Sequence, residues 1–108
     1  MAHIQEISND MQFNSVINGR GKNIIFFGSL RCGHCRNITP FVGTLSQQYD
    51  KGAAPIKFWH VETSTVKTEG IKGVPVFTAY DNGKYVDYLE GASRAGLEKM
   101  CRILSAQR

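Results

Sequence analysis

The stretch NIIFFGSLRCGHCRNITPF, residues 23–41, carries the most information about the fold. It begins with a continuous apolar run bounded by turn residues, which is typical of a strand buried on both faces of a sheet. Two cysteines, Cys32 and Cys35, follow directly, and a helical pattern begins after them. Two thiols at this spacing can close a disulfide, hold half of a metal site or fill a core. The surrounding sequence has to distinguish these uses.

Upstream of this stretch, the apolar pattern predicts one strand and one helix. A short strand is expected over residues 4–7, and polar residues that can cap a helix follow it at positions 8–10. The next apolar residues recur at helical spacing: Phe13, Val16 and Ile17. The segment INGRGKN, residues 17–23, then breaks the helix before the buried strand begins.

Downstream, a long amphipathic helix is expected, with Pro40 inside it predicting a bend. Its apolar series is Ile38, Phe41, Val42, Leu45 and Tyr49. Residues 55–62 predict another buried strand, and residues 63–70 a short helix or a loop. A hairpin is expected around Asp81-Asn82-Gly83, because Asn and Gly tolerate the positive φ of tight turns.

A last helix is predicted from Ser93 onward, with one apolar stripe: Leu97, Met100, Cys101 and Leu104. The predicted element order is therefore βαβαβαββα, with parallel units first and an antiparallel hairpin last. This order indicates an α/β protein whose central sheet is flanked by helices on both faces.

Composition limits the classes of protein that need to be considered. A chain of 108 residues with 42% hydrophobic residues predicts one domain, residues 1–108. No apolar run is long enough for a membrane helix, and the N-terminus lacks the pattern of a signal peptide, so a cytoplasmic location without membrane association is expected. The net charge of +4 includes no dense basic run, so nucleic acid is not expected as a partner.

The position of the two cysteines predicts an activated thiol. Cys32 stands where the expected helix begins, so unpaired backbone N–H groups and the positive end of the helix dipole face it and favour its thiolate. His34, Arg31 and Arg36 add cationic or hydrogen-bonding groups that lower the thiol pKa further. We therefore expect Cys32 to be the nucleophile and the more buried Cys35 to be the resolving thiol, with Gly33 allowing the tight turn into the helix.

Other uses of the cysteines are less favoured. Three cysteines are too few for a secreted disulfide framework, which also uses an even number of cysteines. A structural zinc site needs four ligands, and this chain has one close pair, so no metal is expected. A structural disulfide or a buried thiol pair remains an alternative. Cys101 lies on the apolar stripe of the last helix and is expected to be inert core.

The sequence resembles a thioredoxin-fold protein nearly from end to end. The segments that carry the resemblance are CGHC at 32–35, Pro40-Phe41, GIKGVPVF at 70–77, DNGK at 81–84 and EGAS at 90–93. The resemblance implies a five-stranded mixed sheet and thiol–disulfide exchange with protein substrates. It implies no cofactor beyond the redox-active Cys32–Cys35 disulfide.

The resemblance also implies partners and a substrate face. Substrate would lie against Val74, Pro75, Gly91 and Ala92, with Pro75 in the cis form and the backbone of Val74 pairing with an extended segment. The partners would be protein thiols and disulfides, with a cellular reductase or glutathione for recycling, and a monomer is expected. Four basic residues are candidates for a collar around the cysteines, although scattered surface charge is the simpler interpretation: Arg31, Arg36, Lys72 and Arg94.

Three positions depart from the family pattern. Arg31 replaces the usual tryptophan, and the only tryptophan, Trp59, belongs to a strand elsewhere. His34 is the choice of the protein disulfide isomerase branch, and we expect it to make the disulfide a better oxidant than in a proline-containing relative. Phe26 occupies the place of a buried carboxylate that accepts the proton of the resolving thiol.

The loss of that carboxylate predicts either slow resolution or a substitute base. Candidates are His34 and His60, and Glu62 is the nearest carboxylate that could take an equivalent buried role. An alternative from another functional class is a thioredoxin-fold binding module that uses the Val74-Pro75 face and turns over little. Phe26 and Arg31 are the residues that keep this alternative open.

Overall fold

The computed structural model describes residues 4–29, 31–63 and 73–107. Its elements occur in the order β1 (Ile4–Ile7), α1 (Asp10–Ile17), β2 (Lys22–Gly28), α2 (Gly33–Tyr49), β3 (Ile56–Glu62), β4 (Val76–Asp81), β5 (Lys84–Glu90) and α3 (Arg94–Ser105). Every strand predicted from the sequence is present within one or two residues. The short helix or loop predicted over 63–70 falls almost entirely outside the described residues.

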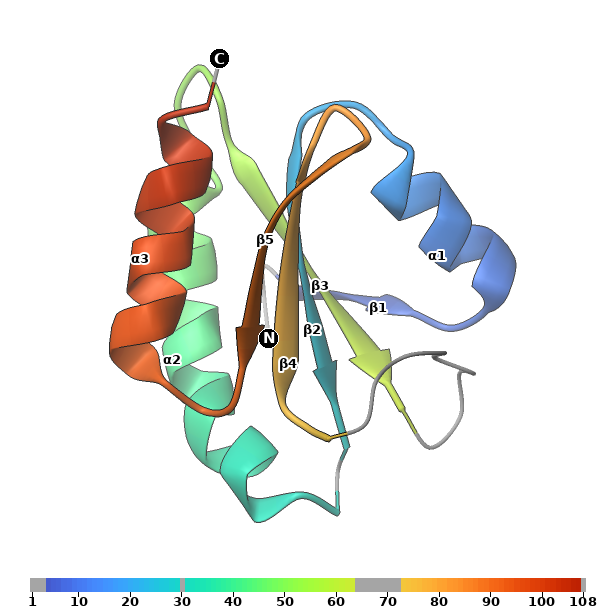
Figure 1. The fold of residues 1–108 in the computed structure, drawn as a ribbon, viewed down its shortest axis with the longest axis vertical. Helices are drawn as coiled ribbons and strands as arrows, with labels where there is room; N and C mark the ends of the chain where they lie inside the picture. The colour runs from blue at the N-terminus through green and yellow to red at the C-terminus, as the bar shows by residue number, and fades with distance from the viewer. Residues whose placement is uncertain (1–3, 30, 64–72, 108) are drawn as a thin grey trace.

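The five strands form one mixed sheet in the order β1-β3-β2-β4-β5. Strands β1, β3 and β2 run parallel, β4 is antiparallel to β2, and β5 is antiparallel to β4. Helices α2 and α3 cover one face of the sheet and α1 covers the other (Figure 1). The predicted α/β class, with a central five-stranded sheet flanked by helices on both faces, is therefore confirmed.

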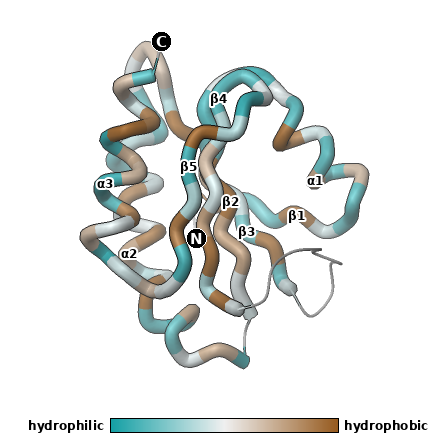
Figure 2. The backbone as a smooth tube through the Cα atoms, viewed as in Figure 1, coloured by the Kyte–Doolittle hydropathy of each residue, from teal (hydrophilic) through white to brown (hydrophobic). Residues whose placement is uncertain are grey.

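Strand β2 is the centre of this arrangement because it is buried on both faces along its whole length. One hydrophobic cluster, which includes Ile24 and Phe26, packs under α2 and α3. A second cluster, which includes Ile25 and Phe27, packs under α1. The hydrophobic parts of the chain accordingly run through the central strands (Figure 2). The continuous apolar run in the sequence follows from this two-sided burial.

Local signals set the ends of the elements. Asn9 and Ser93 cap α1 and α3, each accepting a hydrogen bond from a backbone N–H in the first turn. The turn between β4 and β5 places Asn82 and Gly83 at φ 52° and 83°, as the hairpin prediction required. Pro40 lies inside α2, and the first turns of α2 run at an angle to the rest of the helix (Figure 1).

A buried lysine joins the start of β2 to the end of α3. The side chain of Lys22 is 8% exposed, and its Nζ donates to the carbonyl oxygens of Leu104 at 2.6 Å and Gln107 at 2.7 Å. Asp81 lies 3.5 Å from the same nitrogen. The ammonium therefore donates to carbonyl groups at the end of the helix, where the intrahelical donors run out.

Replacing this lysine is expected to destabilise the fold. A Lys22→Met variant should lose about 1–2 kcal/mol of unfolding free energy, since two carbonyl oxygens would lose a charged donor. Urea unfolding measures the loss. The matched control is Lys57→Met, which removes the more exposed ion pair of Lys57 with Asp50 and should cost less than about 1 kcal/mol. Equal losses in the two variants would contradict this role for Lys22.

Candidate active site

The two cysteines lie where β2 leads into α2, at the carboxyl end of the central strand. Cys32 is the N-cap residue of α2, and its Sγ accepts a hydrogen bond from the backbone N–H of Cys35 at 3.2 Å. Both cysteines are free thiols. Cys32 is half-buried, whereas Cys35 is 3% exposed. The predicted difference in burial between the two thiols is confirmed.

The site shifts the pKa values of the two thiols in opposite directions. Partial burial raises the pKa of Cys32, but hydrogen bonds from the Cys35 side chain and from the backbone N–H groups of Cys35 and His34, together with the charge of Arg36, leave the pKa below its ordinary value. Burial and the neighbouring Cys32 sulfur raise the pKa of Cys35 to about 11. One thiol is therefore prepared to attack as a thiolate, while the other keeps its proton.

The contribution of His34 differs in detail from the sequence expectation. Its effect on the pKa of Cys32 comes from its backbone N–H. Of the two arginines that flank the motif, Arg36 supplies the charge that lowers this pKa, while Arg31 is exposed and its backbone N–H donates to the Ser29 hydroxyl at 3.2 Å. His34, in the first turn of α2, therefore lowers the pKa of Cys32 through its backbone N–H.

One of the residues expected at the substrate face, Val74, lies beside Cys32. The Val74–Pro75 peptide bond is cis, as the resemblance implied. The Cys32 Sγ lies 3.8 Å from the Val74 carbonyl oxygen, and the backbone N–H of Gly91 donates to the Pro75 carbonyl at 2.8 Å. Val74, Pro75 and Gly91 line one small cleft of about 270 Å³, and the exposed Ala92 follows Gly91 in the chain.

The proposed basic collar is only partly described. Arg31, Arg36 and Arg94 are exposed, and Lys72 lies outside the described residues. The Arg94 guanidinium lies over the Phe41 ring at 5.5 Å from its centre, so this charge packs against α2. The collar as a unit stays a prediction.

Beneath Cys35 the core is aromatic. Phe26 is 3% exposed, and its ring stacks on that of Phe77 with centres 4.9 Å apart. A Cβ added at Gly28 would lie 2.8 Å from Phe26 and 3.3 Å from the Cys35 Sγ, so only glycine fits there without displacing the site. The buried place that the family gives to a carboxylate thus holds an apolar ring.

The residues on the far side of Phe26 include one that no sequence motif indicates. The Nδ1 atom of His60 lies 2.6 and 2.9 Å from the two carboxylate oxygens of Glu6. His60 is one of the substitute bases expected from the sequence, whereas Glu6 is not. Its place follows from strand register, since Glu6 pairs with His60 across β1 and β3. No local spacing in the sequence carries that information.

The third cysteine belongs to the core. Cys101 is fully buried among the residues under α2 and α3, and burial raises the pKa of its thiol to about 12. Among residues 4–29, 31–63 and 73–107 no group of three or more metal-binding side chains comes together. Within the same ranges, no helix has the length and hydropathy needed to cross a membrane.

Comparison with known proteins places this site in a family. The thioredoxin family profile matches residues 4–103. The chain belongs to the thioredoxin family. It is 35% identical to a thioredoxin of Coprinus comatus over 101 residues, covering 90% of this chain and 93% of the relative. It is 33% identical to thioredoxin 1 of Plasmodium falciparum over 104 residues, covering 95% and 99% of the two chains.

The structural comparison agrees with this assignment. A solved structure of Plasmodium falciparum thioredoxin superimposes with a TM-score of 0.81 at 29% identity, over 91% of this chain and 96% of that one. Thioredoxins are thiol–disulfide oxidoreductases that act on protein disulfides and are themselves reduced by reductases. The chain is therefore a thiol–disulfide oxidoreductase of this family, and its Cys32–Cys35 spacing fits the family's paired-cysteine motif.

Proposed function

We propose that this protein reduces or exchanges disulfides in protein substrates, with Cys32 attacking the substrate disulfide and Cys35 resolving the mixed disulfide. The observation that carries the proposal is the contrast between the thiols. Cys32 is a half-buried helix N-cap with a lowered pKa, and Cys35 is a buried thiol whose pKa is about 11. Attack through the more acidic and more accessible sulfur follows from that contrast.

The substrate is proposed to bind as an extended segment beside Val74. The Val74 carbonyl lies next to the Cys32 sulfur, and the cleft at Val74, Pro75 and Gly91 flanks it. Pairing through the main chain would orient a substrate disulfide toward Cys32 without reading many side chains. This mode suits protein substrates of varied sequence.

The test is the reduction of insulin disulfides with dithiothreitol as electron source, monitored by precipitation of the insulin B chain. The unmodified protein should accelerate precipitation well above the dithiothreitol background. Brief treatment with iodoacetamide near neutral pH should alkylate Cys32 first, because its pKa is the lower one, and should remove the acceleration. The binding-module alternative predicts no cysteine-dependent rate at all.

Three further properties stay predictions for this chain. They are a cytoplasmic location, a monomeric state, and recycling by a cellular reductase or by glutathione. Support for the last comes only from the general behaviour of thioredoxins. Coupled assays with a thioredoxin reductase and with reduced glutathione distinguish the two recycling routes.

A further inference from the structure

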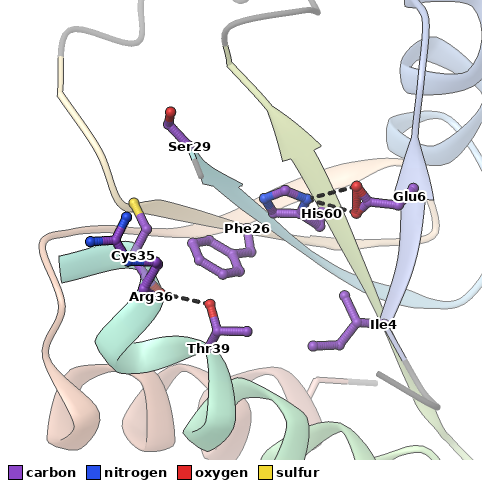
Figure 3. Close-up of a pocket in the computed structure, with 8 residues that line it drawn as sticks. All are labelled: Ile4, Glu6, Phe26, Ser29, Cys35, Arg36, Thr39 and His60. Carbon is purple, nitrogen blue, oxygen red and sulfur yellow. Dashed lines mark hydrogen bonds and ion pairs between the residues drawn. The ribbon is translucent and has the colours of Figure 1, made fainter. Parts of the chain in front are cut away.

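A cavity lies between the resolving cysteine and a histidine on β3. Its volume is about 280 Å³, and its walls include Glu6, Phe26, Ser29, Cys35, Arg36 and His60 (Figure 3). One water molecule needs roughly 10–15 Å³ of such volume, so the cavity can hold several. A buried thiol and an imidazole thus face one space that water can fill.

The sheet register explains why these side chains meet. Glu6, His60, Phe26 and Phe77 are successive cross-strand neighbours on β1, β3, β2 and β4. They belong to the sheet face that α2 covers, since Phe26, Phe77 and Cys35 share one core cluster. The edge of His60 packs against Phe26 with ring centres 5.1 Å apart. The row thus begins in solvent at Glu6, whose side chain is 61% exposed, and ends in the core cluster that contains Cys35.

The Glu6 carboxylate fixes the role of the imidazole. A carboxylate only accepts hydrogen bonds, so the Nδ1 atom of His60 carries the proton that Glu6 binds. In the neutral ring, Nε2 then has a free lone pair and can accept a proton. In Figure 3 the second ring nitrogen of His60 points away from Glu6, toward the side of the cavity where Ser29 and Cys35 lie.

We propose that His60, oriented by Glu6, accepts the proton of Cys35 through cavity water when Cys35 resolves the mixed disulfide. The inference rests on the proposed function of the two cysteines. In this step the Cys35 sulfur bonds to the Cys32 sulfur, and the bond from Cys32 to the substrate sulfur breaks with its electron pair going to the substrate. The two cysteines are oxidised, and the substrate is reduced and leaves as a thiolate. The Cys35 proton passes to Nε2 of His60 and from there to solvent.

The charges around the cavity are consistent with this transfer. Two causes that raise the pKa of Cys35, a hydrogen bond and a charge, come from the Cys32 sulfur, and both are lost once that sulfur is in a mixed disulfide. Glu6 stabilises the imidazolium that forms. Among the described residues, two other charged groups lie near the cavity. Arg36 on α2 opposes the imidazolium, and Glu62 on β3 favours it while raising the pKa of Cys35.

The experiment is a stopped-flow reaction of the reduced protein with 5,5′-dithiobis(2-nitrobenzoate). The first equivalent of released thionitrobenzoate reports attack by Cys32, and the second reports resolution by Cys35. The rate of the second phase should rise with pH across the range in which histidines titrate, about pH 5 to 8. The His60→Asn variant keeps a donor for Glu6 but has no base at this position. Its second phase should be about tenfold slower at neutral pH, and the rise of its rate between about pH 5 and 8 should be lost.

Two companion variants locate the base. Glu6→Gln should slow the second phase at neutral pH, because the imidazolium that forms loses its carboxylate partner. In Glu62→Gln the rate of the second phase should still rise with pH as it does in the unmodified protein. The inference is overturned if the rate and pH profile of the second phase are unchanged in His60→Asn. It is also overturned if the rise of the rate with pH disappears in Glu62→Gln instead.

A rescue and an internal control cover the case of a poorly folded variant. Phe26→Asp added to His60→Asn should restore the second phase, since a carboxylate then lies beneath Cys35. Failure to restore it, in a protein whose buried Cys101 reacts only after denaturation, counts against the inference. A wild-type protein that releases one equivalent alone would instead contradict the proposed function of the cysteine pair.

Discussion

A Cys35→Ser variant is expected to trap its substrate as a mixed disulfide on Cys32. Attack by Cys32 requires only the N-cap thiolate and its donors, of which the backbone N–H of Cys35 is retained by serine. Release requires the second thiol. A positioned intramolecular thiol has an effective molarity far above millimolar external thiols, so the lifetime of the adduct should rise by at least about 100-fold.

The adduct is measured by intact-mass spectrometry after mixing the variant with a peptide that contains one disulfide. The matched control is Cys32→Ser, in which both remaining thiols, Cys35 and Cys101, are buried and have raised pKa values. It should form adduct far more slowly and should not turn over insulin. If Cys32→Ser forms the adduct as fast as Cys35→Ser, the assignment of attack to Cys32 is wrong.

The parts of this molecule that the sequence predicted are those set by local chemistry. The strand at residues 23–29 was readable because both of its faces are buried, and the hairpin because Asn82 and Gly83 must adopt positive φ. The activated thiol was readable because a strand followed by a helix places Cys32 at a helix N-terminus. Each of these inferences needs only residues that are close in sequence.

The parts that the sequence did not predict depend on register and on contacts between distant segments. Lys22 binds carbonyl groups more than 80 positions away at the end of α3, and nothing in its neighbourhood in the sequence indicates that. Glu6 meets His60 only because β1 and β3 pair in one particular register. A shift of one residue would have turned Glu6 to the other face of the sheet.

Phe26 shows how the two kinds of information combine. The sequence placed an apolar residue where the family keeps a carboxylate, and on that basis either a slow step or a substitute base was expected. The structure adds the cavity that joins Cys35 to His60. The substitute could be selected among His34, His60 and Glu62 only after the sheet had placed them relative to Cys35.

The reduction potential should respond to the backbone at position 34 more than to its imidazole. His34 contributes a backbone N–H to the Cys32 sulfur, and a thiolate stabilised in this way stabilises the reduced protein. In a His34→Pro variant this donor is absent, so the reduced form is less stable and the potential becomes more negative. A shift of about 30–90 mV is expected, where 30 mV corresponds to about 1.4 kcal/mol for two electrons. Proline is tolerated in the first turn of a helix, so the fold should persist.

The matched control is His34→Ala, which keeps the backbone N–H and removes the ring. Titration against glutathione over a range of pH measures both variants. Reduction takes up two protons below the pKa of Cys32 and one between that pKa and the pKa of Cys35 near 11, so the slope changes from about 59 to about 30 mV per pH unit at the pKa of Cys32. This break should move to higher pH in His34→Pro and stay nearly in place in His34→Ala. An equal shift in both variants would assign the effect to the imidazole, and no shift in His34→Pro would remove His34 from the control of the potential.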